Sequence, residues 1–301
     1  MLEDLRAKNR PITPFVLRMA AAMDAMAAGA AAQGEEASMV KPGDASMAAP
    51  FTVKAASVGP VLDVLRQGRS TLVTTVQMFK ILGLLCLSTA YSLSVMYMDG
   101  IKLGDMQATL SGVLTAGMFF FISHAKPLER LAPQRPHGRV FSPYVFSSLL
   151  GQFAVHIAFL ALVQRWAHAV MPREERQLPD AEFAPNLINT VCFLVNFVVQ
   201  TITFAVNYAG EPFATPLREN ALFFRSVKWA ALSYVALVLD VPPGVRTWFS
   251  LVPIPAAMQA VLLGGAAAVY FLTQAIERAA KNAFPPPTVQ QLIREQSKRQ
   301  Q

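Results

Sequence analysis

The sequence predicts an all-α polytopic membrane protein, with six transmembrane helices that follow a short soluble segment. Its 301 residues are 53% hydrophobic and only 15% charged, whereas soluble globular proteins have about 25% charged residues. Residues 1–70 hold several charges and no long apolar run, while the chain beyond them is dominated by apolar segments. These segments can cross a hydrocarbon core of about 30 Å, which takes about 20 helical residues.

Six segments have the length and composition of membrane spans. We expect them at residues 81–98, 106–123, 144–163, 187–208, 227–241 and 256–276. The first four and the sixth contain no Asp, Glu, Lys or Arg. The fifth is expected to extend back to Ala221, and Arg225, Lys228 and Asp240 crowd its ends. The stretch "RQGRSTLVTTVQMFK" at 66–80 is expected to continue into the first span as one helix.

Basic residues beside the spans predict the orientation in the membrane. The loop after the second span carries four basic residues against Glu129: Lys126, Arg130, Arg135 and Arg139. The tail carries five more: Arg278, Lys281, Arg294, Lys298 and Arg299. Because positive charges accumulate in cytosolic loops, we expect this loop and both termini in the cytosol. The net charge of +7 therefore indicates membrane orientation, and we expect no nucleic-acid partner.

Cysteine and histidine usage predicts neither disulfides nor a metal site. Cys86 and Cys192 both lie in apolar segments and are interpreted as buried packing residues. The four histidines and these cysteines show no zinc-ligand spacing. Gln152 and His156 lie four residues apart in the third span, where a structural hydrogen bond is the preferred interpretation. The N-terminus has no cleavable signal peptide pattern, so insertion is expected to depend on an internal span.

Four stretches resemble consecutive landmarks of one protein family. They are "GDASMAAPFT" at 43–52, "RQGRSTLVTTVQMFKILGL" at 66–84, "DMQATLSGVLTAGMFFFISHAKPLERL" at 105–131 and "FAVNYAGEPF" at 204–213. The family is that of the type-five-A P-type ATPases of the endoplasmic reticulum. The landmarks occur in the family's order, and the resemblance covers about residues 39–275.

The resemblance implies a domain organisation. Residues 1–38, rich in alanine and methionine, are expected to be a low-complexity, mobile lead. Residues 39–65 would be the end of a phosphorylation domain and 66–80 a cytosolic stalk helix. Residues 81–277 would form the fifth to tenth spans of a larger transporter, and 278–301 a basic cytosolic tail.

The resemblance also implies a function. The family extracts misinserted or mistargeted transmembrane helices from the endoplasmic reticulum membrane, driven by ATP, through a wide pocket open laterally to the bilayer. The expected location is therefore that membrane, with several spans and both termini in the cytosol. Two alternatives stay open: transport of a cation such as manganese, and a non-catalytic membrane remnant.

The cofactors implied for the full-length enzyme are ATP and Mg, through an aspartyl-phosphate. The family's DKTGT and TGDGxND motifs do not occur in this sequence, nor does its proline-rich fourth span. We therefore expect this chain alone to bind no cofactor, to hold no catalytic residue and to be inactive, as a piece of a longer protein. The expected partners are membrane lipids, client transmembrane helices and the missing N-terminal and cytosolic domains of the same ATPase.

Polar residues inside the spans are the candidates for a substrate pocket. Asn196, Gln200 and Asn207 recur at spacings of four and seven and should share one helical face. They are interpreted either as a polar wall of a pocket or as interhelical hydrogen-bonding groups. Asp105 and Gln107 open the second span and form either a polar vestibule or a helix N-terminal cap.

Polar residues before the first span are interpreted mainly as parts of the stalk. Gln77 is the member expected to reach the inner end of the pocket. Arg66, Arg69 and Lys80 are placed on the stalk and at the cytosolic interface, where the long side chain of Lys80 is expected to extend to the lipid headgroups. Gly264 and Gly265 in the sixth span are interpreted as sites of close helix packing.

Overall fold

The computed structural model describes residues 57–171, 183–291 and 297. The chain divides into two units, Met1–Asp63 and Val64–Gln301, and the description below concerns the second. The expectations for residues 1–38, for most of 39–65 and for the end of the tail lie outside the described residues. The described residues form seven helices and no β-strand.

The six long helices match the six predicted spans. They are α3 (Gly59–Met98), α4 (Asp105–Ser123), α5 (Pro143–Val170), α6 (Leu187–Asn207), α7 (Ala221–Leu239) and α9 (Ala256–Ala283), with the short α8 (Val245–Trp248) before the last. Each of the six is long and apolar enough to cross a membrane. The all-α, six-span prediction is confirmed, and so is the continuity of residues 66–80 with the first span.

Two helices run beyond their predicted ends. α5 ends at Val170 and α9 at Ala283, whereas the apolar patterns end at residues 163 and 276. The reason is that an α-helix is held by its backbone hydrogen bonds, so it can continue past the end of an apolar run. The additional residues of α9, 277–283, include Glu277.

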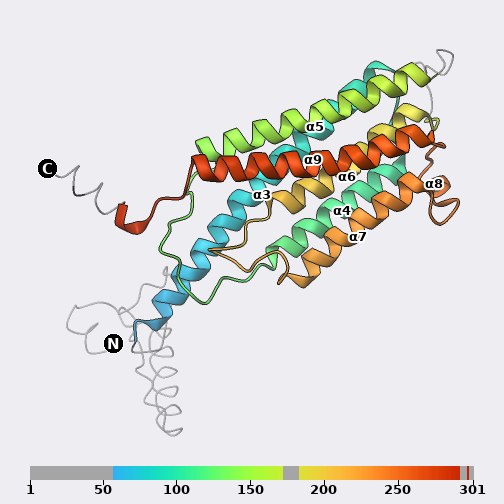
Figure 1. Cartoon of the computed structure of the whole chain (residues 1–301). Helices are drawn as coiled ribbons and strands as arrows, with labels where there is room; N and C mark the ends of the chain where they lie inside the picture. Colours follow the sequence, from blue (N-terminus) through green and yellow to red (C-terminus); the bar gives the residue numbers. More distant parts are fainter. Residues whose placement is uncertain (1–56, 172–182, 292–296, 298–301) are drawn as a thin grey trace, which may run out of the picture. The chain divides into compact units, whose positions relative to one another are not determined.

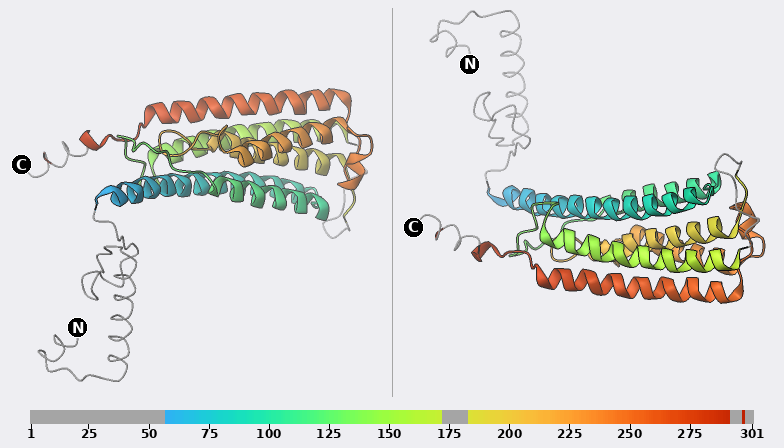
Figure 2. Two further views of the ribbon diagram at one scale, coloured as in Figure 1. Left: turned by 90° about the horizontal axis from the view of Figure 1, so that it is seen from below. Right: turned by 90° about the horizontal axis from the view of Figure 1, so that it is seen from above.

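The helices run side by side, with α3 and α4 on one side of the bundle and α9 on the other (Figures 1 and 2). α6 is the central helix. In its most apolar stretch of 18 residues, 89% of the residues are buried, whereas in the other five long helices this share is 17% to 33%. This agrees with its sequence, because a helix that is apolar all round belongs in an interior. Phe193, Phe197 and Phe204 of α6 are among the largest fully buried side chains.

Glycines let α5 and α9 pack closely. A Cβ atom added to Gly265 of α9 would meet Cε2 of Phe159 at 2.2 Å, and one added to Gly151 of α5 would meet Cγ2 of Ile276 at 2.8 Å. A Cβ on Gly264 would meet nothing within 4 Å. The predicted close packing therefore holds for Gly265 and is wrong for Gly264, which lies one residue, or about 100°, around the helix.

Arg246 of α8 caps the C-terminus of α7. Its side chain is buried, and its guanidinium donates from Nε to the carbonyl oxygen of Leu237 at 2.9 Å and from Nη2 to that of Val238. The backbone of Asp240 turns there with φ 59°. A cation at a helix C-terminus satisfies carbonyls that have no intrahelical donor.

Replacing Arg246 by methionine is expected to lower the free energy of unfolding by about 2 kcal/mol, because hydrogen bonds from a charged donor contribute about 1.5–3 kcal/mol. Thermal unfolding of the purified full-length protein in detergent would measure this. Arg165→Met is the control, since Arg165 is exposed. Equal melting temperatures for the two variants would contradict the capping role.

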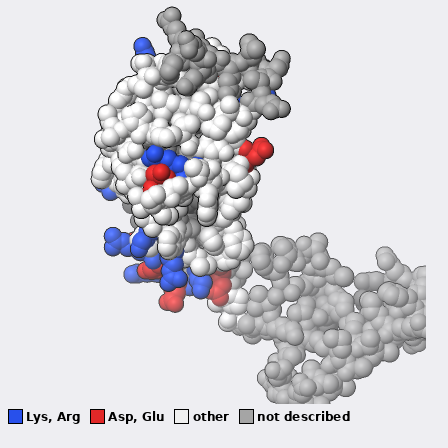
Figure 3. Space-filling model, turned by 90° about the vertical axis from the view of Figure 1, so that its right-hand side faces the viewer, with Lys and Arg blue, Asp and Glu red and all other residues white. Residues whose placement is uncertain are grey.

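Much of the molecular surface is uncharged. In Figure 3, basic and acidic side chains gather in a cluster at the lower edge and in a small group in the middle, with broad areas free of both on this face. Large apolar side chains are exposed on these helices, among them Trp229, Leu232 and Phe271. Such a surface suits contact with lipid tails.

Candidate functional site

A cavity of about 520 Å³ lies between the middle parts of α3, α4 and α6. We call it the mid-span cavity. Its polar lining consists of Cys86, Ser88, Thr89, Ser111, Thr115, Asn196 and Gln200, and the remainder is apolar or small. None of the residues that line it is charged. The mid-span cavity is therefore polar through hydroxyl, thiol and amide groups.

Gln200 and Asn196 form the α6 wall of the mid-span cavity. Gln200 donates from Nε2 to the carbonyl oxygen of Ser111 at 3.0 Å and to the hydroxyl of Thr115, both on α4. Asn196 donates from Nδ2 to Oγ of Ser92 on α3 at 2.6 Å. Both interpretations of these amides thus describe part of the geometry, because the residues line a cavity and also join α6 to its neighbours.

Asn207 does not belong to this wall. Its Nδ2 donates to Oε1 of Gln152 at 2.9 Å, and its Oδ1 accepts from Nε2 of Gln152 at 3.0 Å. The two side chains join the C-terminal end of α6 to α5. The predicted common face is therefore divided among three neighbours, α3, α4 and α5, because α6 is surrounded by helices and adjacent parts of one face meet different partners.

Gln107 is fully buried, and its side-chain amide makes hydrogen bonds within the protein. Its Nε2 donates to Oδ1 of Asn189 at 2.8 Å and to the carbonyl oxygen of Phe249 at 3.0 Å, and its Oε1 accepts from the backbone of Gly104 at 3.3 Å. It lines none of the cavities described here. Asp105 is exposed in the first turn of α4, where an acidic residue suits the helix dipole. The geometry of both agrees with the capping interpretation.

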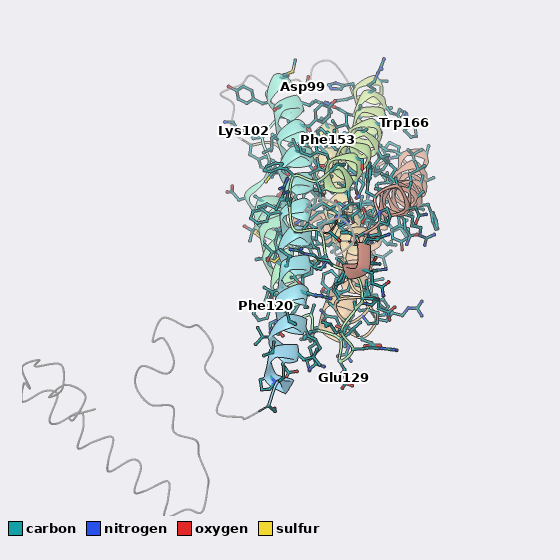
Figure 4. All side chains as sticks on the ribbon, turned by 90° about the vertical axis from the view of Figure 1, so that its left-hand side faces the viewer. Asp99, Lys102, Phe120, Glu129, Phe153 and Trp166 are labelled. Carbon is teal, nitrogen blue, oxygen red and sulfur yellow. The ribbon has the colours of Figure 1, made fainter. Side chains whose placement is uncertain are left out.

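The N-terminal part of α3 carries the remaining candidates. Arg69 donates from Nη1 to the carbonyl oxygens of Ala132 at 2.6 Å and Gln134 at 3.1 Å, and Arg66 donates to that of Glu129. Figure 4 shows Glu129 and Phe120 toward one end of the bundle, with Asp99, Lys102 and Trp166 toward the other. We call the end that carries Arg66, Arg69 and Glu129 the basic end.

A second cavity, of about 250 Å³, lies at the basic end between α3, the loop before α5, the loop after α6 and the end of α9. We call it the basic-end cavity. Gln77 lines it, and its Oε1 accepts from the backbone of Ala209 at 2.7 Å. Gln77 therefore lines a different cavity from the one that contains Asn196 and Gln200.

Lys80 lies inside the protein, with only 3% of its surface exposed. It forms an ion pair with Glu277 of α9. The predicted extension toward lipid headgroups is wrong, because a buried carboxylate offers the ammonium a closer partner. Sequence reasoning missed Glu277, and also the part played by Tyr144, Ser148 and Gln152, which surround it. Their spacing of four residues in an otherwise apolar segment was the available signal.

The cysteines and the histidine of the spans are only partly as predicted. Cys192 is buried, but Cys86 is exposed and lines the mid-span cavity, because it faces away from the core. Nδ1 of His156 lies 3.4 Å from Oγ of Ser88. Among the described residues there is no group of three or more His, Cys, Asp or Glu that could hold a metal ion.

Comparison with known proteins decides the family. No family model matches the chain. It is 54% identical over 252 residues to a probable manganese-transporting ATPase of Arabidopsis thaliana, 52% identical over 189 residues to an endoplasmic reticulum transmembrane helix translocase of Saccharomyces cerevisiae, and 41% identical over 253 residues to the translocase of that name in Schizosaccharomyces pombe. The chain belongs to the type-five-A P-type ATPases.

The matches cover 84%, 63% and 84% of this chain, in that order, but only 21%, 16% and 21% of the relatives. This type-five-A ATPase chain therefore spans about a fifth of their length. Its described residues contain no cluster of three or more His, Cys, Asp or Glu and no phosphorylation motif. What the type-five-A chain does contribute is membrane structure: six spans and the two cavities.

Proposed function

We propose that the intact ATPase extracts transmembrane helices from the endoplasmic reticulum membrane, and that the mid-span cavity forms part of its substrate pocket. Two relatives are named as translocases of transmembrane helices in that membrane. The observation that carries the proposal is the lining of the mid-span cavity, which is polar but uncharged. A cargo helix is mostly apolar, so its few polar groups need hydrogen-bonding partners while its apolar surface needs no charge nearby.

The proposal includes an orientation. Lys126, Arg130, Arg135 and Arg139 precede α5 at the basic end. By the positive-inside rule this end faces the cytosol. α3 would then be the stalk that leads from the phosphorylation domain to the spans, and ATP hydrolysis on the missing domains would move it. The proposed partners of this chain are those domains, the lipids and the client helices.

A photoreactive amino acid placed at Asn196 or at Gln200 of the full-length protein tests the pocket. We expect light-dependent capture of a misinserted single-span protein in endoplasmic reticulum vesicles. The same probe at Phe271 of α9, where 65% of the residue surface is exposed, is the control for contact with proteins in the bilayer. Equal capture at Phe271 and Asn196 would refute the pocket assignment.

Replacing Gln200 by leucine is expected to reduce extraction of the same client about fivefold, since the loss of one hydrogen bond is equivalent to about 1 kcal/mol. Extraction is measured as ATP-dependent release of the client from vesicles. Stimulation of ATP hydrolysis by manganese that disappears in Gln200→Leu, with no client release by the wild type, would instead favour cation transport. One relative bears the name of a probable manganese-transporting ATPase.

A further inference from the structure

A buried polar network surrounds Glu277, outside the proposed substrate pocket. The residue is 4% exposed. Its carboxylate accepts from the hydroxyl of Tyr144 at 2.5 Å, from that of Ser148 at 2.5 Å and from Nε2 of Gln152 at 3.3 Å, all on α5. Lys80 of α3 forms the ion pair with it. The Glu277 network thus joins three helices at the basic end.

α3 makes polar contacts with several other parts of the bundle. Unlike α5 and α9, α3 does not pack closely, backbone against backbone, with any other described helix. Polar contacts recur along it instead. They are made by Arg66 and Arg69 with the loop before α5, Gln77 with Ala209, Lys80 with Glu277, Ser88 with His156, Ser92 with Asn196, and Asp99 with His168. Directional contacts of this kind can be exchanged in discrete steps.

The charges of the network have alternative partners nearby. Lys281, one turn after Glu277, places Nζ 3.3 Å from Oε1 of Glu277 while about half of its side chain is exposed. Lys80, Lys281 and the exposed Glu211 all line the basic-end cavity. Because Lys80 and Glu211 line the same cavity, Glu211 is the second carboxylate available to Lys80 if α3 shifts, while Lys281 keeps Glu277 paired. Both arrangements contain two cations and two anions, so neither leaves a buried charge alone.

Stability alone does not explain a buried ion pair. Removing one partner leaves an uncompensated charge and is strongly destabilising, but replacing both by apolar residues of similar size is often neutral. A pair of apolar side chains would also hold α3 to α9 in one arrangement, although the hydroxyls of Tyr144 and Ser148 would lose their acceptor. What it would lack is a second arrangement with defined partners.

We propose that Glu277 is a positioning residue of the transport cycle, which holds α3 to α5 and α9 through Lys80 and releases it when Lys80 moves to Glu211. The proposal rests on the proposed function in one respect only: the transport cycle of the ATPase must move α3. Glu277 contacts neither client nor nucleotide in this scheme. It determines how movement of α3 reaches the rest of the bundle.

The test compares single and double substitutions in the full-length ATPase. Lys80→Met and Glu277→Leu should each lower the melting temperature. The double variant should recover part of the loss, because it leaves no buried charge unpaired, although Tyr144, Ser148 and Gln152 lose an acceptor. The double variant should still hydrolyse ATP, but the client released per ATP should fall about tenfold, within the usual range of coupling between sites. Lys228→Met, which removes an exposed lysine from α7, is the control and should behave as wild type. A double variant with the wild-type ratio of client to ATP would overturn the proposal.

Glu211→Gln gives a second test that does not depend on the folding of the double variant. Glu211 is exposed, so the melting temperature should not change, while release of client per ATP should fall because Lys80 loses its second partner. An unchanged ratio would refute the exchange.

A measurement without client separates this inference from the proposed function. Spin labels at Leu72 of α3 and Phe271 of α9 should report a distance that changes between the ATP-bound and phosphate-analogue states in the wild type. The change should be lost in the double variant. A constant distance in the wild type would overturn the inference, whereas a changing distance without any client release would contradict only the proposed function.

Discussion

Replacing Gly265 by alanine is expected to lower the free energy of unfolding by about 1–3 kcal/mol, the usual cost of overpacking a well-packed interior. The new methyl group would lie 2.2 Å from Cε2 of Phe159, and the ring is itself buried. Either the ring must leave its position or α5 and α9 must separate. Thermal unfolding of the purified protein in detergent measures the effect.

The neighbouring residue supplies the control. Gly264→Ala adds the same methyl group where nothing lies within 4 Å, and alanine favours a helix over glycine by about 0.8–1.0 kcal/mol. We therefore expect unchanged or higher stability for Gly264→Ala. If both variants lost stability equally, the loss would come from lipid contacts of α9 and not from its packing on α5.

Replacing Phe204 by alanine is expected to cost about 3–5 kcal/mol, as for other buried aromatic residues. Phe204 is fully buried on α6, and its ring packs edge-on against Phe119 of α4, with centroids 4.9 Å apart. Removal of the ring leaves a cavity between α4 and α6 that neither helix can fill without moving. The measurement is again the shift in the unfolding midpoint.

Phe271→Ala is the matched substitution on the outer surface. That residue has 65% of its surface exposed, and lipid tails can occupy the space of its ring. We expect a change within about 0.5 kcal/mol, as for surface substitutions in general. A loss as large as that of Phe204→Ala would mean that α9 is covered by protein in the intact ATPase.

The number and type of the long helices were predictable because they depend on local composition. Apolar segments of about 20 residues leave a chain in lipid no alternative but to satisfy its backbone within a helix. The helical ends were less predictable, since α5 and α9 continue where the side chains are already polar. Charged residues near both ends of α7 interrupt its apolar pattern. Its start is fixed by Asn220, whose side-chain oxygen accepts a hydrogen bond from the backbone N–H of Phe223 at 3.3 Å, and Asn220 directly precedes the predicted extension to Ala221.

The candidate site was predicted only where one helix supplied the signal. Asn196 and Gln200 are four residues apart on α6, and this spacing alone brings them to one wall. Gln107 donates a hydrogen bond to Asn189, which lies 82 positions later in the sequence. No local pattern could therefore show that the side chain of Gln107 is engaged inside the protein.

The ion pair of Lys80 and Glu277 illustrates the same limit for charges. The two residues are 197 positions apart, and Glu277 lies just after the apolar part of its segment. Hydropathy therefore treated both as ends of spans, where charges belong. Only tertiary structure, which brings the middle of α3 and the C-terminal part of α9 to the same level, turns two boundary residues into an interior pair.

The contacts of Arg66 and Arg69 determine which changes the loop before α5 can accept. Both guanidinium groups bind carbonyl oxygens of the main chain, at Glu129, Ala132 and Gln134. Every amino acid presents the same carbonyl group, so substitutions in this loop can accumulate without loss of the attachment. An insertion or deletion of one residue would displace the carbonyl oxygens from the arginines. The length of this loop is therefore constrained far more tightly than its sequence.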